Sequence, residues 1–371
     1  MKRIVVVAVV TLALLGILGW AYWEHRGSGD RRNAGKHADS ASPVAGLSSI
    51  TVDKDGNLFV CARKLNRVFK ISRGGEASVA AGDGKAGYGG DGGPATDASL
   101  AEPMSVALNS AGDLFIADMG NNRVRKVDAK TGVIHTVAGN GTMGGTSGAA
   151  AVSTGLYEPV SIAFDRNDDL YIGGTTGQAI RRVDAITGIS IRVIGASLPG
   201  LPTIPEPAVG PFWVTAGKGD EIFFSDPTRN SVHWFDTATN TSRRMAGSAV
   251  CGFAGDGGPS SGALLCFPEG LLADHADRLL IADSGNNRIR ALNLTTGVIS
   301  TLAGVGRVGY SGDNGPAANA ELNGPASITE DAQGNVYIAD TGNDCVRSIA
   351  AGTGIIRTLF DAGDVAGVNS R

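Results

Sequence analysis

Three glycine-rich stretches of the chain each hold one aspartate, in the pattern Gly-Asp-Gly-Gly-Pro or Gly-Asp-Asn-Gly-Pro. The three aspartates are Asp91, Asp256 and Asp313. Glycine-rich loops bind phosphate in nucleotide-binding proteins, but none of these stretches continues into Lys-Ser/Thr and a helix start, as such loops do. Calcium takes six to eight oxygen ligands from several carboxylates or carbonyls, so a single aspartate in each loop is weak evidence for a calcium site. The pattern favours turns, and we expect no cofactor, with calcium as the open alternative.

A carboxylate and a guanidinium recur five residues apart in the phrase Ile-Ala-Asp-x-Gly-Asn-Asn-Arg. The complete pairs are Asp118 with Arg123 and Asp283 with Arg288. A ring of such groups would suit an anionic or peptide ligand, whereas a local ion pair would fix a turn or tie it to the next repeat. Because the pair occupies the same place in each copy of the phrase, the structural interpretation is favoured.

Residues of the common catalytic and metal-binding types do not have the spacing that their chemistry requires. The four cysteines include no Cys-x-x-Cys pair, and no Gly-x-Ser-x-Gly elbow occurs in the chain. The histidines are His25, His37, His135, His233 and His275. These spacings predict neither a zinc site nor a nucleophilic triad.

Two of the cysteines, Cys251 and Cys266, flank the loop that holds Asp256. In an oxidising compartment, cysteines at the two ends of a long glycine-rich loop are placed to form a disulfide. The alternative is a pair of separate buried thiols. Cys61 and Cys345 occupy different positions in the repeat, and we expect no bond between them.

The elements that position these residues follow from a repeat. The chain of 371 residues contains 55 glycines, which indicates many tight turns and short strands. A unit of four apolar or β-branched runs recurs six times at intervals of 52 to 57 residues, starting at Leu47, Pro103, Pro159, Pro211, Pro268 and Pro325. Each unit predicts a four-stranded antiparallel blade, with its innermost strand near 48–52, 104–108, 160–164, 212–216, 269–273 or 326–330. One blade cannot bury both of its faces, whereas six around an axis can, so we predict an all-β, six-bladed β-propeller.

The phrase at 115–125, which returns with small changes at 280–290 and 337–347, resembles the NHL repeat. The resemblance covers about 47–360 and implies a six-bladed propeller. Propellers of this kind include scaffolds, ligand-binding sensors, lyases and lactonases, so the resemblance leaves the activity open. The lyases hold a metal with several histidines at the axial channel, and here no histidine falls on an innermost strand. The lactonases use Glu, Asn and Asp on those strands, which here are mostly small and apolar.

One cluster departs from the average repeat at the start of the innermost strands. Its members are Glu102, Glu158, Phe212, Trp213 and Glu269. In a four-stranded blade the connection to the next blade and the turn between the second and third strands emerge on one face, which we call the loop-rich face. There the cluster would rim the channel mouth and suit a cationic or sugar-like ligand, or an aromatic anchor for a protein partner. The alternative is that Phe212 and Trp213 pack an irregular junction between the third and fourth blades.

An uncharged apolar segment, Ile4 to Trp23, follows Lys2 and Arg3 and is long enough to span a bilayer. We expect an uncleaved signal anchor over 1–23, although Gly19-Trp20-Ala21 also permits cleavage after Ala21. The polar residues 24–46 predict a flexible stalk, 47–360 the propeller and 361–371 a C-terminal tail. Both interpretations place the propeller outside the cytoplasm, anchored in the cell envelope or, if cleaved, secreted or periplasmic.

The net charge of −4 and the pI near 5.8 give no reason to expect nucleic acid as a partner, because phosphate binding needs a basic face. We therefore expect an exported, membrane-tethered, non-enzymatic propeller that binds a protein or a small ligand on its loop-rich face. The alternative is a hydrolase or lyase of the six-bladed propeller type with its site at the channel mouth.

Overall fold

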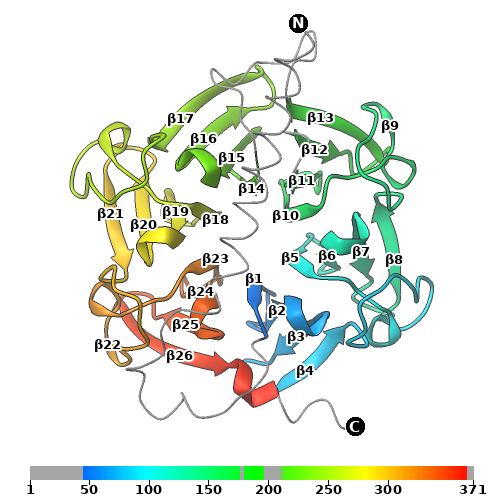
Figure 1. Ribbon diagram of the computed structural model, residues 1–371, viewed down its shortest axis with the longest axis horizontal. Helices are drawn as coiled ribbons and strands as arrows, with labels where there is room; N and C mark the ends of the chain where they lie inside the picture. Colours follow the sequence, from blue (N-terminus) through cyan, green and yellow to red (C-terminus); the bar gives the residue numbers. More distant parts are fainter. Residues whose placement is uncertain (1–44, 176–178, 196–209, 211, 366–371) are drawn as a thin grey trace, which may run out of the picture. The chain divides into compact units, whose positions relative to one another are not determined.

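The computed structural model describes residues 45–175, 179–195, 210 and 212–365. These residues form six blades around a central axis (Figure 1). The apolar segment Ile4 to Trp23, most of the expected stalk and the end of the expected tail lie outside the described residues. Within the described ranges, no helix is both long and apolar enough to cross a membrane.

Each blade contains a four-stranded antiparallel meander whose strands follow chain order from the axis outward. The strands of blades 1 to 3 are β1 (Leu47–Val52), β2 (Leu58–Ala62), β3 (Arg67–Ile71) and β4 (Ala77–Ala81); β5 (Pro103–Leu108), β6 (Leu114–Asp118), β7 (Arg123–Val127) and β8 (Ile134–Ala138); β10 (Pro159–Phe164), β11 (Leu170–Gly174), β12 (Ala179–Val183) and β13 (Ile189–Gly195). Those of blades 4 to 6 are β14 (Trp213–Ala216), β15 (Glu221–Asp226), β16 (Ser231–Asp236) and β17 (Thr241–Gly247); β18 (Pro268–Ala273), β19 (Arg278–Asp283), β20 (Arg288–Asn293) and β21 (Ile299–Ala303); β23 (Pro325–Glu330), β24 (Val336–Asp340), β25 (Cys345–Ile349) and β26 (Ile355–Asp361). The predicted six-bladed architecture is confirmed.

The connections between blades also protect the outer edges of the sheets. The short strands β9 (Ala149–Ala150) and β22 (Gly315–Pro316) pair with β13 and β26. Pro94 and Pro259 form single bridges with Val133 and Val298, which directly precede β8 and β21. An exposed outer strand presents unpaired N–H and C=O groups that invite edge-to-edge association. The glycine-rich loops thus run down the outside of the blade that follows them and cover its edge.

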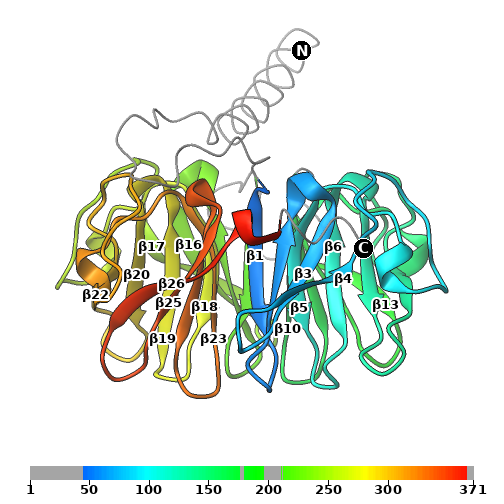
Figure 2. The ribbon, with the colours of Figure 1, turned by 90° about the horizontal axis from the view of Figure 1, so that it is seen from below.

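Apolar side chains alternate along the strands and fill the spaces between neighbouring blades. On β5, Val106 packs in the cluster shared with blade 1, while Ala107 packs against the cluster shared with blade 3. Successive side chains of a strand point to opposite faces of the sheet, so each blade contributes to two such clusters. Seen from the side, the strands run between the two faces of the ring (Figure 2).

Two kinds of side chain tie blades to their neighbours: serines do so from blades 1, 2, 3 and 6, and an Asn or Asp of the turn does so at five of the described junctions. Serines at the third position of an innermost strand accept the N–H of the next innermost strand, as Ser105 Oγ does from Ile162 at 3.2 Å. The second Asn of the Asn-Asn-Arg turn accepts the N–H of the residue that precedes the next blade, as Asn122 Oδ1 does from Glu158 at 3.0 Å. We call the contact made by the second Asn the asparagine latch.

The ring closes without exchange of a strand, because blades 1 and 6 each consist of consecutive strands. Asp344 takes the place of the latch asparagine and accepts the Gly46 N–H at 2.8 Å, and Ser327 Oγ accepts the Ile50 N–H at 3.2 Å. The apolar cluster between these blades includes Val60 of blade 1 and Val346 of blade 6. Closure therefore uses the same contacts that join the other blades.

Candidate functional site

The Asp of the Ile-Ala-Asp phrase ends the second strand of its blade and organises the loop-rich face from there. In blade 5, Asp283 is fully buried, and its Oδ1 accepts the Cys266 N–H at 2.8 Å. Its Oδ2 accepts the Asn286 side-chain amide at 2.8 Å and lies 3.3 Å from Arg290 Nη1. The amide of Asn286 also donates to the Gly252 carbonyl at 2.7 Å. Asn286, the first Asn of the turn, thus joins the end of β19 to the preceding glycine-rich loop.

Arg290 is also fully buried and connects the same aspartate to the glycine-rich loop. Its Nη2 and Nε lie 2.6 and 3.1 Å from Asp256 Oδ1, and Nη2 donates to the Ala254 carbonyl at 3.2 Å. Two acidic partners and backbone carbonyls compensate the desolvation of the buried guanidinium. The same arrangement, which we call the arginine clamp, occurs in blades 2 and 6, where Arg125 joins Asp118 to Asp91 and Arg347 joins Asp340 to Asp313.

The structure corrects the partners predicted for the paired Asp and Arg residues. Asp118 and Arg123 lie opposite each other on β6 and β7, as do Asp283 and Arg288 on β19 and β20, yet the guanidinium facing each aspartate belongs to the arginine two residues further on. Arg288 instead donates to the Val305 carbonyl at 2.7 Å. The Val305 carbonyl and the Phe253 ring of the glycine-rich loop hold the Arg288 guanidinium away from Asp283.

Burial shifts the titration of the clamped aspartates. Removal from water raises the pKa of Asp118, Asp283 and Asp340 to about 6, although hydrogen bonds from backbone N–H and Asn side chains and the nearby arginine lower it. The loop partner Asp91 is more exposed, and hydrogen bonds from Thr136 together with Arg125 hold its pKa below the usual value. In the arginine clamp of blade 2, the buried Asp118 therefore releases its proton at a higher pH than the loop partner Asp91.

Replacement of Asp283 by asparagine is expected to flatten the pH dependence of stability. An unfolded aspartate titrates near pH 3.9, whereas native Asp283 titrates at about 6, so the native chain binds more protons in between and the free energy of unfolding falls as pH rises. Urea unfolding of the wild type and Asp283→Asn between about pH 4 and 7 measures this slope. The other two clamps still titrate, so the slope should be reduced and not abolished; parallel curves would contradict the assignment.

The glycine-rich loops present aromatic rings next to arginine on the loop-rich face. The Arg123 guanidinium lies 3.8 Å from the centre of the Tyr88 ring, and that of Arg288 lies 3.7 Å from the centre of the Phe253 ring. Tyr88 is 47 % exposed and Phe253 42 % exposed. These stacked pairs stand on loops that the arginine clamps hold in place.

The axial channel, about 180 Å³ in volume, is lined by the innermost strands of all six blades. Four of these strands carry the serines that bind the next blade, at Ser49, Ser105, Ser161 and Ser327. Trp213 and Gly270 take the corresponding positions in blades 4 and 5. In the part of the chain that the structure describes, no group of three His, Cys, Asp or Glu side chains is placed to hold a metal.

The predicted mouth cluster consists of residues with separate partners. Glu102 lies 3.3 Å from Arg63 of the preceding blade, and Glu158 accepts the Thr175 hydroxyl. Phe212 is fully buried, with its ring centre 5.6 Å from that of Phe224. Trp213 lines the channel, and the Glu269 side chain is buried. The aromatic members thus pack in the interior or line the channel. Glu102 links two neighbouring blades, and Glu158 links the start of one strand to the end of the next strand in the same blade.

The backbone at the channel mouth adopts an unusual conformation. Glu102 and Glu158 have φ of 49° and 42°, in the left-handed region that glycine prefers. The equivalent repeat positions of blades 1, 4 and 6 are Gly46, Gly210 and Gly324, also with positive φ. The asparagine latch binds the N–H of Glu102, Glu158 and Gly324 in this conformation, and Asp344 binds that of Gly46.

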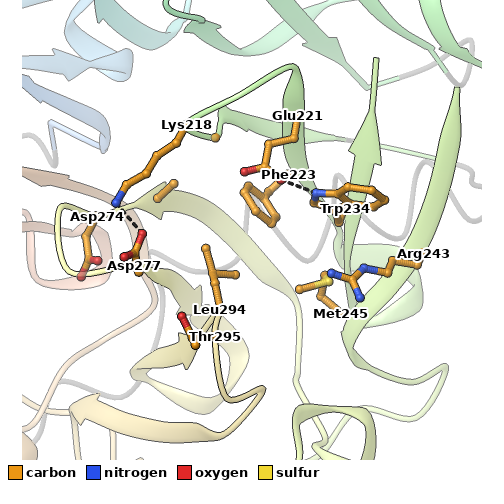
Figure 3. A pocket seen from close by; sticks show the side chains of 12 residues that line it. Lys218, Glu221, Phe223, Trp234, Arg243, Met245, Asp274, Asp277, Leu294 and Thr295 are labelled. Carbon is orange, nitrogen blue, oxygen red and sulfur yellow. Dashed lines mark hydrogen bonds and ion pairs between the residues drawn. The ribbon is translucent and has the colours of Figure 1, made fainter. Parts of the chain in front are cut away.

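A cavity that the sequence did not predict lies between blades 4 and 5, on the face opposite the loop-rich one. It measures about 260 Å³ and is lined by Phe223, Trp234, Arg243, Ala273 and Leu294 among others (Figure 3). The relevant sequence signal is the small Ala273 at the end of an innermost strand where blade 3 has Phe164.

The closing cysteines of the blade 4 to 5 loop are joined: the structure contains a disulfide between Cys251 and Cys266. Cys61 and Cys345 are buried free thiols. Because the N–H of Cys266 is bound by Asp283, the disulfide is continuous with the arginine clamp of blade 5.

Comparison with known proteins gives relatives of the repeat region. The chain is 27 % identical over 272 residues to Protein SUPPRESSOR OF QUENCHING 1, chloroplastic, of Arabidopsis thaliana, a match that covers 68 % of this chain and 25 % of that protein. It is 24 % identical over 339 residues to human NHL repeat-containing protein 2, covering 89 % of this chain and 42 % of the relative. The chain thus spans between a quarter and about two fifths of the length of these relatives. No family model matches it.

Solved structures share the architecture at low sequence identity. A Bacteroides thetaiotaomicron protein of unknown function superposes with a TM-score of 0.63 at 18 % identity, covering 83 % of this chain and 70 % of that one. A streptogramin B lyase superposes with a TM-score of 0.53 at 17 % identity, covering 86 % and 85 %. At these identities the likeness concerns the fold alone. The described residues, with their repeated Asp-x-Gly-Asn-Asn-Arg turns and their NHL-repeat relatives, form an NHL-repeat β-propeller.

Proposed function

We propose that this chain is a non-enzymatic binding propeller that docks a protein partner on its loop-rich face. The observation that carries the proposal is the pairing of half-exposed aromatic rings with arginine on clamped loops, at Tyr88 with Arg123 and at Phe253 with Arg288. Aromatic residues and arginine are the side chains most enriched at the energetic centres of protein interfaces.

The loops that carry these pairs are held by their own chain before any partner arrives. Each arginine clamp fixes its loop through a fully buried guanidinium, and the loop also pairs with the outer strand of its blade. A surface that is already ordered loses little conformational entropy on binding. Val250 and Val308, 63 % and 64 % exposed, extend the apolar surface of the loops between blades 4 and 5 and between blades 5 and 6.

The channel mouth supports a binding role for the same face. Glu102 and Glu158 occupy left-handed positions that glycine fills in three other blades, at a conformational cost on the order of 1 kcal/mol each. Side chains retained at such positions add an acidic rim beside the aromatic loops. The hydrolase or lyase alternative has no comparable support, because the channel is lined mainly by aliphatic side chains and by hydroxyls that bind neighbouring blades.

The proposal includes export. A propeller tethered through Ile4 to Trp23 would present its loops outside the cytoplasm, and a disulfide between Cys251 and Cys266 fits an oxidising compartment. No nucleic acid and no cofactor enter the proposal.

The docking proposal is tested with the full chain and two double variants. Tyr88→Ser with Phe253→Ser removes the aromatic rings of the loop-rich face, and Ile186→Ser with Val298→Ser is the matched control in turns of the opposite face. Quantitative cross-linking in envelope preparations should show partners of the wild type retained by the control and reduced roughly tenfold in the loop variant. Equal retention by both variants, or equal loss from both, would contradict docking on this face.

A further inference from the structure

The cavity between blades 4 and 5 has an apolar floor and one aromatic wall. Phe223 and Leu294 lie at its centre, with the indole of Trp234 and the thioether of Met245 on the side of blade 4 (Figure 3). Phe223 is 1 % exposed to solvent. The cavity volume of about 260 Å³ is at the small end of the range for ligand pockets. The walls of such pockets are mostly apolar, with a few oriented polar groups.

The repeat itself explains why this junction is hollow. At the junction of blades 2 and 3, Phe115 meets Phe164 edge to face, with ring centres 4.6 Å apart. Phe223 and Ala273 are the corresponding residues between blades 4 and 5, since each occupies the same place in its strand. The methyl of Ala273 cannot reach the space that the Phe164 ring fills. The chain thus has, at one junction, an opening that it closes with an aromatic pair at another.

Most charged groups around the cavity already have partners. Glu221 accepts the indole N–H of Trp234, and Asp274 binds Arg278 at 2.7 Å. Lys218 reaches from the turn of blade 4 to Asp277 in the turn of blade 5. The carboxylates are therefore occupied by donors of the chain itself.

Arg243 differs from these groups. It lies opposite Trp234 in the ladder of β16 and β17, is exposed, and holds its guanidinium 4.9 Å from the centre of the indole ring. Within the described part of the chain it has no ion-pair partner. A guanidinium stacked on an aromatic wall keeps its N–H donors free for a planar anion such as a carboxylate.

We propose that this cavity binds a small carboxylic acid with an aromatic or branched apolar body. The apolar body occupies the space between Phe223, Trp234 and Ala273, and the carboxylate meets Arg243 at the rim. A cationic ligand would find the nearby carboxylates already paired and the unpaired charge positive. The site is on the face opposite the proposed protein-docking surface and does not depend on it.

Phenylacetate, phenylacetamide and phenethylamine test the proposal on the full chain, because they share a ring and differ in the charge of the head group. Calorimetry should give saturable binding of phenylacetate with a dissociation constant on the order of 1 mM or below, and binding of the amide and the amine roughly tenfold weaker. Arg243→Gln should remove the preference for the acid over the amide. Arg244→Gln, at the exposed neighbouring position, is the matched control and should keep it.

Ala273→Phe installs the ring that the junction of blades 2 and 3 already uses and should abolish binding. Ala273→Leu, which copies Leu108 of blade 2, serves if the larger residue destabilises the fold, as judged from the thermal midpoint. The proposal is overturned if the amine or the amide binds as tightly as the acid. It is also overturned if phenylacetate shows no saturation at about 10 mM, or if a folded Ala273 variant binds it as the wild type does.

Discussion

Replacement of Arg290 by methionine is expected to lower the free energy of unfolding by about 3–5 kcal/mol at neutral pH. The guanidinium is fully buried between Asp283, which is also fully buried, and Asp256 of the glycine-rich loop. Methionine fills much of the volume but leaves a buried carboxylate without its positive partner, which costs far more than the ion pair itself contributes. Urea unfolding followed by circular dichroism measures the change.

Arg288→Met is the matched control for this variant. Arg288 is two residues away on the same strand, partly exposed, and bound to the Val305 carbonyl and the Phe253 ring. Its loss should cost about 1–2 kcal/mol, because neither of its partners is a buried charge. Hydrogen exchange of the loop between Cys251 and Cys266 should accelerate in Arg290→Met more than in Arg288→Met. Equal destabilisation by the two substitutions would show that the arginine clamp has no special role.

Removal of the disulfide by Cys251→Ser with Cys266→Ser is expected to lower the free energy of unfolding by about 3 kcal/mol. The bond closes a loop with a sequence separation of 15, and its constraint acts mainly on the unfolded chain. Alkylation of protein unfolded without reductant should modify Cys61 and Cys345 and leave the bonded pair unmodified.

The same thiol measurement tests the proposed location. Mass spectrometry of a non-reduced digest of envelope material should contain a peptide pair linked through Cys251 and Cys266. A free, alkylated Cys251 in that material would remove the support that the disulfide gives to export. Reduced and oxidised samples with the same unfolding midpoint would contradict the proposed stabilisation.

The fold could be predicted from sequence because its information is local and repeated six times. Each inner strand begins close to its predicted start, since a proline or its equivalent, a run of apolar residues and a glycine-containing turn recur in every unit. The sequence alone does not predict the pairing of Asp283 with Arg290. Arg288 and Arg290 lie on one face of the same strand, and either is spaced to reach the aspartate. Only the position of the loop carbonyls decides between Arg288 and Arg290.

The candidate sites were harder to predict because they depend on contacts between blades. Glu102 pairs with an arginine 39 residues earlier, and Phe223 faces a residue of the next blade. A single sequence ranks Ala273 as one more apolar strand residue. The small size of the Ala273 side chain indicates a cavity only when it is compared with Phe164, which occupies the same place in another blade. The repeat allows this comparison once the blades are superposed.

The asparagine latch has a consequence for how the chain reaches its closed form. Four of the described latches join residues 36 or 37 apart in sequence, whereas Gly46 and Asp344 are 298 apart. Forming the same contact across eight times the chain length carries an additional loop-closure cost of about 2 kcal/mol. Neighbouring blades can associate as soon as they form, but the seam between blades 6 and 1 must wait for the whole ring. That seam is where the assembled propeller should first come apart.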